Sequence, residues 1–163
     1  MNYKIILVGE SGVGKTSMNL RYVYNQFNFD TTPTTASYYF SKILNIDNSK
    51  IKLSIWDTAG QECYRAITQN FYRNTNGAML VYDISKRRTF EQIPYWYNSF
   101  TNYAGGNSDC VLIGNKSDLD DERAVSSDEV YEFAEKIGIE YFETSSKSRQ
   151  NIEEVFYYLA NKI

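Results

Sequence analysis

Short apolar runs alternate with amphipathic segments from one end of the chain to the other. Runs that are apolar throughout are typical of strands in a parallel sheet, because helices cover both faces of such a sheet. Several of these runs end at glycine or at a polar residue, where a buried strand would meet a loop. The pattern predicts parallel strands at residues 3–8, 78–82 and 110–114, and a shorter one at 139–143.

Two further strands are predicted at residues 38–46 and 51–56, separated only by Asp47-Asn48-Ser49-Lys50. A connection this short joins antiparallel neighbours, whereas parallel strands need a long crossover. One edge of the sheet is therefore expected to be antiparallel. Residues 25–36, which precede this hairpin, are polar and rich in threonine without any periodicity, so we expect a loop there.

Apolar residues at spacings of three and four predict helices between the strands. The first helix is expected over residues 16–24. Ser126 and Glu129 predict a capping box at the start of a later helix, which Gly138 would end. The last helix is expected over residues 152–163, with one apolar face.

Aromatic residues dominate the remaining helical pattern, between Phe90 and Tyr103. Pro94 lies inside it, so we expect a loose first turn and a regular helix that starts with Pro94 at its N1 position. The favoured interpretation of the large side chains is ordinary packing against the sheet; they are Trp96, Tyr97, Phe100 and Tyr103. Together the segments predict one α/β domain over residues 1–163, with a mostly parallel sheet and helices on both faces.

The composition excludes several classes of chemistry. The 163 residues carry 17 Lys and Arg against 20 Asp and Glu, a net charge of −3 that gives no basic field for nucleic acid. There is no histidine for a Ser-His-Asp or Cys-His nucleophile. Cys63 and Cys110 are too few for a disulfide scaffold or a four-ligand zinc site. No apolar run spans a membrane and no signal peptide opens the chain, so we expect a cytoplasmic protein.

A phosphate-binding loop is predicted at Gly9-Glu10-Ser11-Gly12-Val13-Gly14-Lys15-Thr16. It follows a predicted strand and precedes a predicted helix, the context in which backbone N–H groups curl round a polyphosphate. We expect Lys15 to reach the β- and γ-phosphates and the Thr16 hydroxyl to bind Mg²⁺. This context disfavours the alternative, a glycine-rich turn with an incidental lysine. The residues expected to contact the phosphates and the metal are Ser11, Gly12, Val13, Gly14, Lys15, Thr16 and Ser17.

A second motif, Asp57-Thr58-Ala59-Gly60-Gln61, follows the second hairpin strand. An Asp at the carboxyl edge of the sheet would lie beside the phosphate loop and hold the metal through water. The Gly60 backbone N–H would approach a γ-phosphate. The alternative is a strand-end Asp that caps a turn, which the neighbouring phosphate loop disfavours.

Two later motifs predict guanine as the base. Asp118, in Asn115-Lys116-Ser117-Asp118, has two acceptor oxygens that match the N1–H and the exocyclic amine of guanine, whereas adenine presents an acceptor at the first position. We expect Asn115 to tie this loop to the phosphate loop and the Lys116 stem to lie against the base. In Thr144-Ser145-Ser146-Lys147, the Ser146 backbone N–H would donate to the guanine carbonyl. Each motif is weak alone, but all of them follow predicted strands.

With these motifs in order, the chain resembles the Ras-like small GTPases over residues 3–163, and within them the Rab branch. The most Rab-like stretches are residues 52–56, 64–68, 71–73 and 81–85. The resemblance implies a three-layer phosphate-loop G domain, with a six-stranded sheet, one antiparallel edge strand and about five helices. It also implies a switch that binds GTP or GDP with Mg²⁺, hydrolyses GTP slowly and regulates vesicle and membrane trafficking through effectors.

The resemblance also implies roles for single residues. Phe27 would lie edge-on to the guanine, and Gln61 would orient the attacking water. Thr34 would sense the γ-phosphate as a Mg²⁺ ligand, and it lies 18 residues after Thr16, as the switch threonine of the family does. The implied catalytic set is Lys15, Thr34, Gly60 and Gln61; the metal set is Thr16, Thr34 and Asp57; the base set is Phe27, Asn115, Lys116, Asp118, Ser145, Ser146 and Lys147.

The chain departs from the Rab pattern where partners bind. Residues 34–39 read Thr-Thr-Ala-Ser-Tyr-Tyr, where Rabs read Thr-Ile-Gly-Val-Asp-Phe, so particular partners cannot be carried over. An exchange factor, a GTPase-activating protein and effectors are expected at residues 31–40 and 60–73. Cys63 replaces a usual arginine on this surface, and Ser146 replaces a usual alanine whose expected contact is through the backbone.

Three aromatic residues match a Rab surface between the two switches: Tyr39, Trp56 and Phe71. They either form a partner surface or belong mostly to the core, and the sequence favours neither. Lipidated Rabs carry cysteines in a terminal tail that residues 1–163 lack, so membrane contact is expected only through such a tail, on the cytosolic face of an intracellular membrane. We expect a monomer.

Two other functions stay open. A nucleotide-gated scaffold with negligible hydrolysis is compatible with the unusual segment 34–39, although Gly60 and Gln61 argue against it. An ATP-dependent kinase is compatible with the phosphate loop but conflicts with the guanine motif at residues 115–118.

Overall fold

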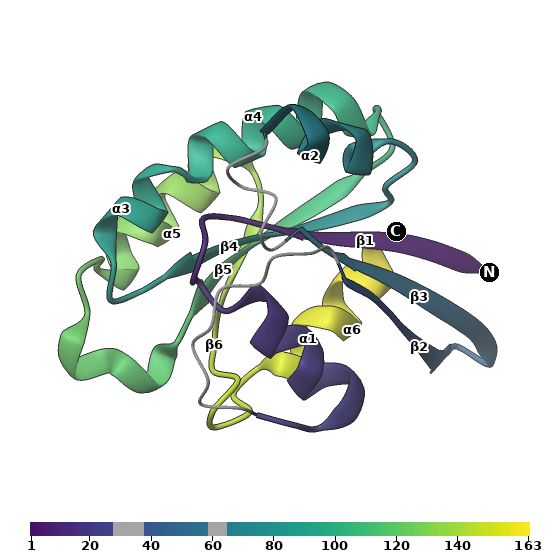
Figure 1. The fold of residues 1–163 in the computed structure, drawn as a ribbon, viewed down its shortest axis with the longest axis horizontal. Helices are drawn as coiled ribbons and strands as arrows, with labels where there is room; N and C mark the ends of the chain where they lie inside the picture. Colours follow the sequence, from purple (N-terminus) through teal and green to yellow (C-terminus); the bar gives the residue numbers. More distant parts are fainter. Residues whose placement is uncertain (28–37, 59–64) are drawn as a thin grey trace.

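A six-stranded sheet forms the middle layer of the computed structural model, which describes residues 1–27, 38–58 and 65–163 (Figure 1). The strand order is β2-β3-β1-β4-β5-β6, and every neighbouring pair is parallel except β2 with β3. The predicted sheet with one antiparallel edge strand is therefore confirmed. The strands are β1 (Asn2–Val8), β2 (Tyr38–Ile46), β3 (Ser49–Asp57), β4 (Gly77–Asp83), β5 (Asp109–Asn115) and β6 (Glu140–Thr144).

Helices cover both faces of the sheet, with α1 and α6 on one side and α2, α3, α4 and α5 on the other (Figure 1). The described residues contain six α-helices and one 3-10 helix, where the resemblance implied about five helices. The apolar pattern predicted four of them, and α2 and α3 are the two that it did not place. The helices are α1 (Lys15–Tyr24), α2 (Arg65–Tyr72), α3 (Arg87–Glu91), α4 (Ile93–Ala104), η1 (Ser117–Glu122), α5 (Ser127–Ile137) and α6 (Ile152–Lys162).

The hairpin turn is shorter than the sequence suggested, because β3 already begins at Ser49. Its two central residues, Asp47 and Asn48, have positive φ angles of 48° and 64°. Asp and Asn tolerate this conformation better than other residues with a side chain, and such turns match the twist of antiparallel strands. The turn chemistry therefore lies in two residues rather than four.

Only one of the two hydrogen bonds of the predicted capping box is present at the start of α5. The Ser126 side chain accepts a hydrogen bond from the Glu129 backbone N–H at 3.3 Å, and Gly138 ends the helix with a φ of 74°. The Glu129 carboxylate, however, pairs with Arg87 rather than returning to the cap. An opposite charge on α3 therefore competes with the reciprocal half of the box.

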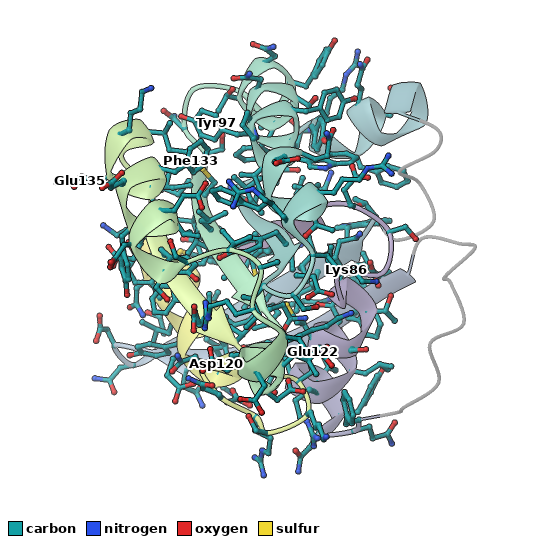
Figure 2. The ribbon with its side chains drawn as sticks, turned by 90° about the vertical axis from the view of Figure 1, so that its left-hand side faces the viewer. Lys86, Tyr97, Asp120, Glu122, Phe133 and Glu135 are labelled. Atoms are coloured by element: carbon teal, nitrogen blue, oxygen red, sulfur yellow. The ribbon has the colours of Figure 1, made fainter. Side chains whose placement is uncertain are left out.

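Two apolar layers hold the sheet between the helices. One contains Tyr22 of α1 stacked on Phe156 of α6, with ring centroids 3.8 Å apart. In the other layer Trp96 and Phe100 of α4 are buried, as predicted. Tyr97 is partly buried there (Figure 2).

Tyr103 departs from this packing prediction, since it is 46% exposed and stacks on Tyr72 of α2 instead. No helix in the described parts of the chain has the length and hydrophobicity to span a bilayer.

Candidate functional site

Buried polar side chains gather at one edge of the sheet. Because β1, β3, β4, β5 and β6 are mutually parallel, their carboxyl ends meet at this edge. A polar group loses its water on burial and needs a partner, so such a cluster is costly unless it is organised for a purpose. The buried polar residues at or next to this edge are Lys15, Asp57, Thr58, Asp83, Asn115, Thr144, Ser145 and Ser146.

The phosphate loop packs against its neighbours through glycine. A Cβ at Gly9 would lie 2.1 Å from the Val81 carbonyl oxygen, and one at Gly14 would lie 2.3 Å from Asn115 Nδ2. Gly14 also has a φ of 98° where it precedes α1. The close approach of the Val81 backbone therefore requires glycine at position 9, and the close approach of the Asn115 side chain together with the positive φ requires it at position 14. The loop ends at the N-terminus of α1, where free N–H groups favour an anion.

Lys15 is folded back into this loop and is 2% exposed. Its ammonium donates to the carbonyl oxygens of Gly9 and Glu10, both at 2.8 Å. The charge is thus held inside the loop by two of the loop's own carbonyl oxygens. This arrangement suits a bound polyphosphate, because a fixed cation and backbone donors converge on the same anion.

Thr16 and Asp57 supply two oxygen atoms side by side. The Thr16 hydroxyl donates to Asp57 Oδ2 at 2.5 Å, and Asp57 is buried at the end of β3. Hydroxyl and carboxylate oxygens are ligands that Mg²⁺ accepts together with phosphate oxygens and water. The chemistry of this pair therefore fits the expected metal. Thr34, Gly60 and Gln61 lie outside the described residues.

Asn115 links the two halves of the edge. Its Nδ2 donates to the Val13 carbonyl oxygen at 2.9 Å, and its Oδ1 accepts from the Thr144 hydroxyl at 3.0 Å. The expected tie between the base loop and the phosphate loop is present. Asn115 also reaches Thr144, the last residue of β6, which the sequence did not indicate.

The two loops expected to bind the base contact each other directly. The Ser145 hydroxyl donates to Asp118 Oδ1 at 2.7 Å and accepts from the Ser148 N–H at 3.0 Å. Asp118 remains exposed to solvent, so its carboxylate stays accessible to a ligand. The Ser145 side chain therefore orients the Asp118 carboxylate through Oδ1.

Arg21 of α1 supports the outer side of this pocket. Its guanidinium donates from Nε to the Ser146 carbonyl oxygen at 2.6 Å and lies 5.7 Å from the Phe27 ring centroid. Phe27 is thereby brought to the same side as the loop after β6. Sequence reasoning missed Arg21, because its partner Ser146 lies 125 residues away and no local pattern marks it.

The charged stretch Asp120-Asp121-Glu122-Arg123 has the composition of a solvated loop, but Arg123 is tied to the sheet. The three acidic residues are exposed, as Figure 2 shows for Asp120 and Glu122. Arg123 instead makes a bidentate pair with Glu143 of β6, at 2.7 and 3.0 Å. It joins the end of η1, which begins next to Asp118, to the strand before the Ser145 loop.

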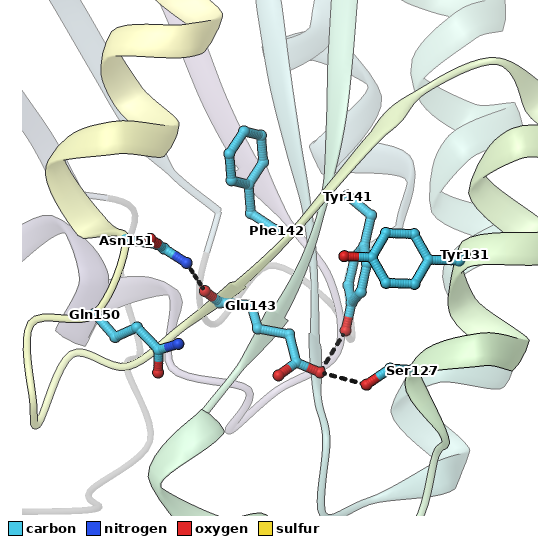
Figure 3. Close-up of a pocket in the computed structure, with 7 residues that line it drawn as sticks. All are labelled: Ser127, Tyr131, Tyr141, Phe142, Glu143, Gln150 and Asn151. Atoms are coloured by element: carbon cyan, nitrogen blue, oxygen red, sulfur yellow. Dashed lines mark hydrogen bonds between the residues drawn. The ribbon is translucent and has the colours of Figure 1, made fainter.

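Glu143 collects further donors in a pocket of about 450 Å³ between β6 and α5 (Figure 3). Its Oε1 accepts from the Tyr141 hydroxyl at 2.9 Å and from Ser127 at 3.2 Å. Burial raises the pKa of Glu143, but the Arg123 and Tyr141 hydrogen bonds outweigh it and hold the pKa below its usual value. Tyr82 meets Tyr141 at 2.9 Å, and burial raises the pKa of both phenols.

The three aromatic residues between the switches form one cluster. The Tyr39 and Trp56 ring centroids are 5.2 Å apart, and those of Trp56 and Phe71 are 6.1 Å apart. Tyr39 is 48% exposed, whereas the other two are half-buried. Lys4 lies over the Trp56 ring and donates to the Phe71 carbonyl oxygen, so it fastens this cluster to β1. The cluster is thus neither wholly core nor wholly exposed.

Comparison with known proteins gives consistent matches along almost the whole chain. The model of the Ras family matches residues 4–163. The chain is 45% identical over 161 residues to Ras-related protein RABA4b of Arabidopsis thaliana, which covers 99% of the chain and 72% of that protein. It is 43% identical over 161 residues to Ras-related protein Rab11D of Nicotiana tabacum, with the same coverage.

A third relative, Ras-related protein Rab11A of Lotus japonicus, is 45% identical over 154 residues, or 94% of this chain and 68% of that protein. The matched residues include the phosphate loop, both base loops and every described strand from β2 onward. The chain therefore belongs to the Ras family and is a Rab-like small GTPase within it.

Proposed function

We propose that this GTPase binds GTP and GDP with Mg²⁺ at the carboxyl edge of the sheet and acts as a switch in membrane trafficking. The observation that carries the proposal is the convergence of Lys15, Asn115 and Asp118 at one edge, with Asn115 bonded to the phosphate loop. In this proposal the phosphate site and the base site form a single unit.

Each half of the site has a defined task. The α1 N-terminus and Lys15 would hold the phosphates, and Asp118 would accept from the guanine N1–H and amine. Thr16 and Asp57 would hold Mg²⁺, with Thr34 as the third contributor. Bound Mg²⁺ would neutralise charge on the phosphate oxygens. The loop 145–147, supported by Arg21, would close over the base.

Hydrolysis needs no strong base in this site. Gln61 and the Thr34 carbonyl would orient water in line with the γ-phosphate, while Lys15 and the loop N–H groups take up the developing charge. Neither the phosphate loop nor residues 25–36 contain an arginine. We therefore expect slow turnover alone, and a gain of roughly 10³–10⁵ from an arginine that a GTPase-activating partner supplies.

Single-turnover hydrolysis of GTP tests this function. We expect Gln61→Leu to slow the reaction by about tenfold or more, because the water loses its orienting group. Gln69→Leu, a change of the same kind in α2, is the matched control and should hydrolyse at the wild-type rate. Equal rates in wild type and Gln61→Leu would contradict the catalytic assignment, and negligible hydrolysis in both would favour a nucleotide-gated scaffold.

Competition between nucleotides tests the class of ligand. GTP should displace a fluorescent GDP analogue from the wild-type protein, and ATP should not, because adenine leaves the Asp118 carboxylate opposite an acceptor. Displacement by ATP at equal concentration would favour the kinase alternative.

Partners are proposed at residues 31–40 and 60–73 and at the cluster of Tyr39, Trp56 and Phe71. Aromatic residues that are partly exposed and already in contact are typical of binding hot spots. We place an exchange factor, a GTPase-activating protein and effectors there, with the protein itself monomeric and any membrane contact made through a lipidated tail.

A further inference from the structure

A buried carboxylate stands between the two halves of the proposed nucleotide site. Asp83 is the last residue of β4 and is fully buried. No motif assigns it a role, and it is neither a proposed phosphate contact nor a proposed metal ligand. An ionised carboxylate without water is costly, so its partners indicate what holds it there.

Its two oxygen atoms have different partners. Oδ1 accepts from the Ser85 N–H at 2.9 Å and from the Ser85 hydroxyl at 2.6 Å. Oδ2 has no hydrogen-bond partner in the described parts of the chain, but the Lys116 ammonium lies 2.9 Å from it. Lys116 is therefore the cation that compensates the buried charge.

Lys116 is held at both ends. Its backbone has a φ of 63° where it precedes η1, and its ammonium also donates to the Gly12 carbonyl oxygen at 2.7 Å. The aliphatic stem between these two anchors passes close to the phosphate loop, with Cε 3.8 Å from the position of a Cβ at Gly14. A stem fixed at both ends loses little further entropy when a flat ring packs against it.

We propose that Asp83 is a positioning residue for nucleotide retention. It fixes the Lys116 ammonium, and so holds the Lys116 stem against the bound base and fastens the base loop to Gly12. This inference rests on the proposed function, since it assumes a guanine nucleotide in the site. Asp83 slows release of the nucleotide without touching it.

Release of a fluorescent GDP analogue measures this effect. We expect Asp83→Asn to release GDP about ten- to a hundredfold faster than wild type. Asn keeps an acceptor for Ser85, and Lys116 is 31% exposed and can return to water, so the variant should fold. The matched control is Glu129→Gln, which removes the acidic partner of Arg87 in an exposed ion pair and should leave the release rate unchanged.

Coupling to Lys116 separates positioning from general stability. Lys116→Met retains the stem but leaves the Asp83 charge buried and unpaired, so it should lower the melting temperature and speed GDP release. Adding Asp83→Asn should then raise the melting temperature of Lys116→Met and should not speed its GDP release further. Equal acceleration by Asp83→Asn in both backgrounds would overturn the proposal.

A measurement on the wild-type protein keeps the proposal testable if Asp83→Asn does not fold. In the GDP complex the Lys116 ammonium should give a resolved ¹⁵N–¹H signal that exchanges slowly with water, identified by its loss in Lys116→Met. Its absence would overturn the proposal. A wild type that binds GDP but has the same release rate as Asp83→Asn would overturn this inference alone, whereas a wild type that binds no guanine nucleotide would overturn the proposed function.

Discussion

The apolar layers on the faces of the sheet and the buried polar residues at its carboxyl edge are organised in opposite ways. In the first, Tyr22 stacks on Phe156, and the contact depends on the shape of two apolar rings. In the second, Asn115 and Asp83 are each placed by a partner far away in sequence. A core residue can be exchanged for another apolar side chain of similar volume, whereas a polar residue at the edge needs particular atoms opposite it.

The largest effect is expected in the apolar layer and should leave the site intact. Phe156→Ala removes a fully buried ring and should lower the free energy of unfolding by about 3–5 kcal/mol. Chemical denaturation of the GDP-bound protein measures this loss. Tyr157→Ala, at the neighbouring position with 53% exposure, should change stability by less than about 0.5 kcal/mol. If Phe156→Ala also changed the preference for guanine over adenine nucleotides, the apolar layer would affect recognition as well as stability, which contradicts the comparison.

Substitutions at the polar carboxyl edge should change nucleotide binding more than they change the stability of the fold. Lys15→Ala removes the buried cation of the phosphate loop and should weaken GDP binding by about a hundred- to a thousandfold, as expected when a phosphate loses its charge-assisted donor. Equilibrium titration with fluorescent GDP measures the change. Lys50→Ala, on the exposed hairpin at the opposite end of the strands, serves as the control. A comparable loss of GDP affinity in both variants would mean that the effect comes from net charge and not from the position of Lys15.

A smaller effect is expected at Glu143, where the edge borders the pocket between β6 and α5. Its pKa is lower in the folded protein than its ordinary value of 4.5, so its contribution to stability is present above that value and is lost as pH falls through the folded pKa. Glu143→Gln should cost about 1–2 kcal/mol at neutral pH, because the amide keeps part of the hydrogen bonding to Arg123 and Tyr141 but loses the charge that strengthens it. Thermal unfolding from pH 7 to pH 3 should show this difference shrinking in acid. A difference in melting temperature between wild type and Glu143→Gln that stays constant from pH 7 to pH 3 would contradict a stabilising role of the ionised Glu143 carboxylate.

The sequence predicted the elements that depend on local pattern. Apolar runs located β1, β4 and β5 to within a residue or two, and Ser126 with Gly138 located α5. It did not locate α2, because its apolar positions begin within a polar stretch and its packing partners lie on α4. The hairpin turn was placed correctly but made too long, since positive φ angles at Asp47 and Asn48 cannot be inferred from residue type alone.

The residues of the candidate site also differ in how far the sequence could predict them. Asn115 and Lys15 belong to contiguous motifs, so their neighbourhood was predictable. Arg21, Arg123 and Asp83 act through partners that only the sheet topology brings near, and none carries a local signal. For Asp83 the only indication was a polar residue at the end of a buried strand, which fits a turn cap as well.

The central claim is that Asp118 reads guanine at an edge that Lys15 and Asn115 complete. Binding of GDP and of xanthosine diphosphate by wild type and Asp118→Asn tests it most directly. An amide offers a donor that the guanine amine cannot accept but a xanthine carbonyl can, so Asp118→Asn should lose about a hundredfold or more in GDP affinity and prefer the xanthine nucleotide. Unchanged GDP affinity, with no gain for xanthosine diphosphate, would contradict the account.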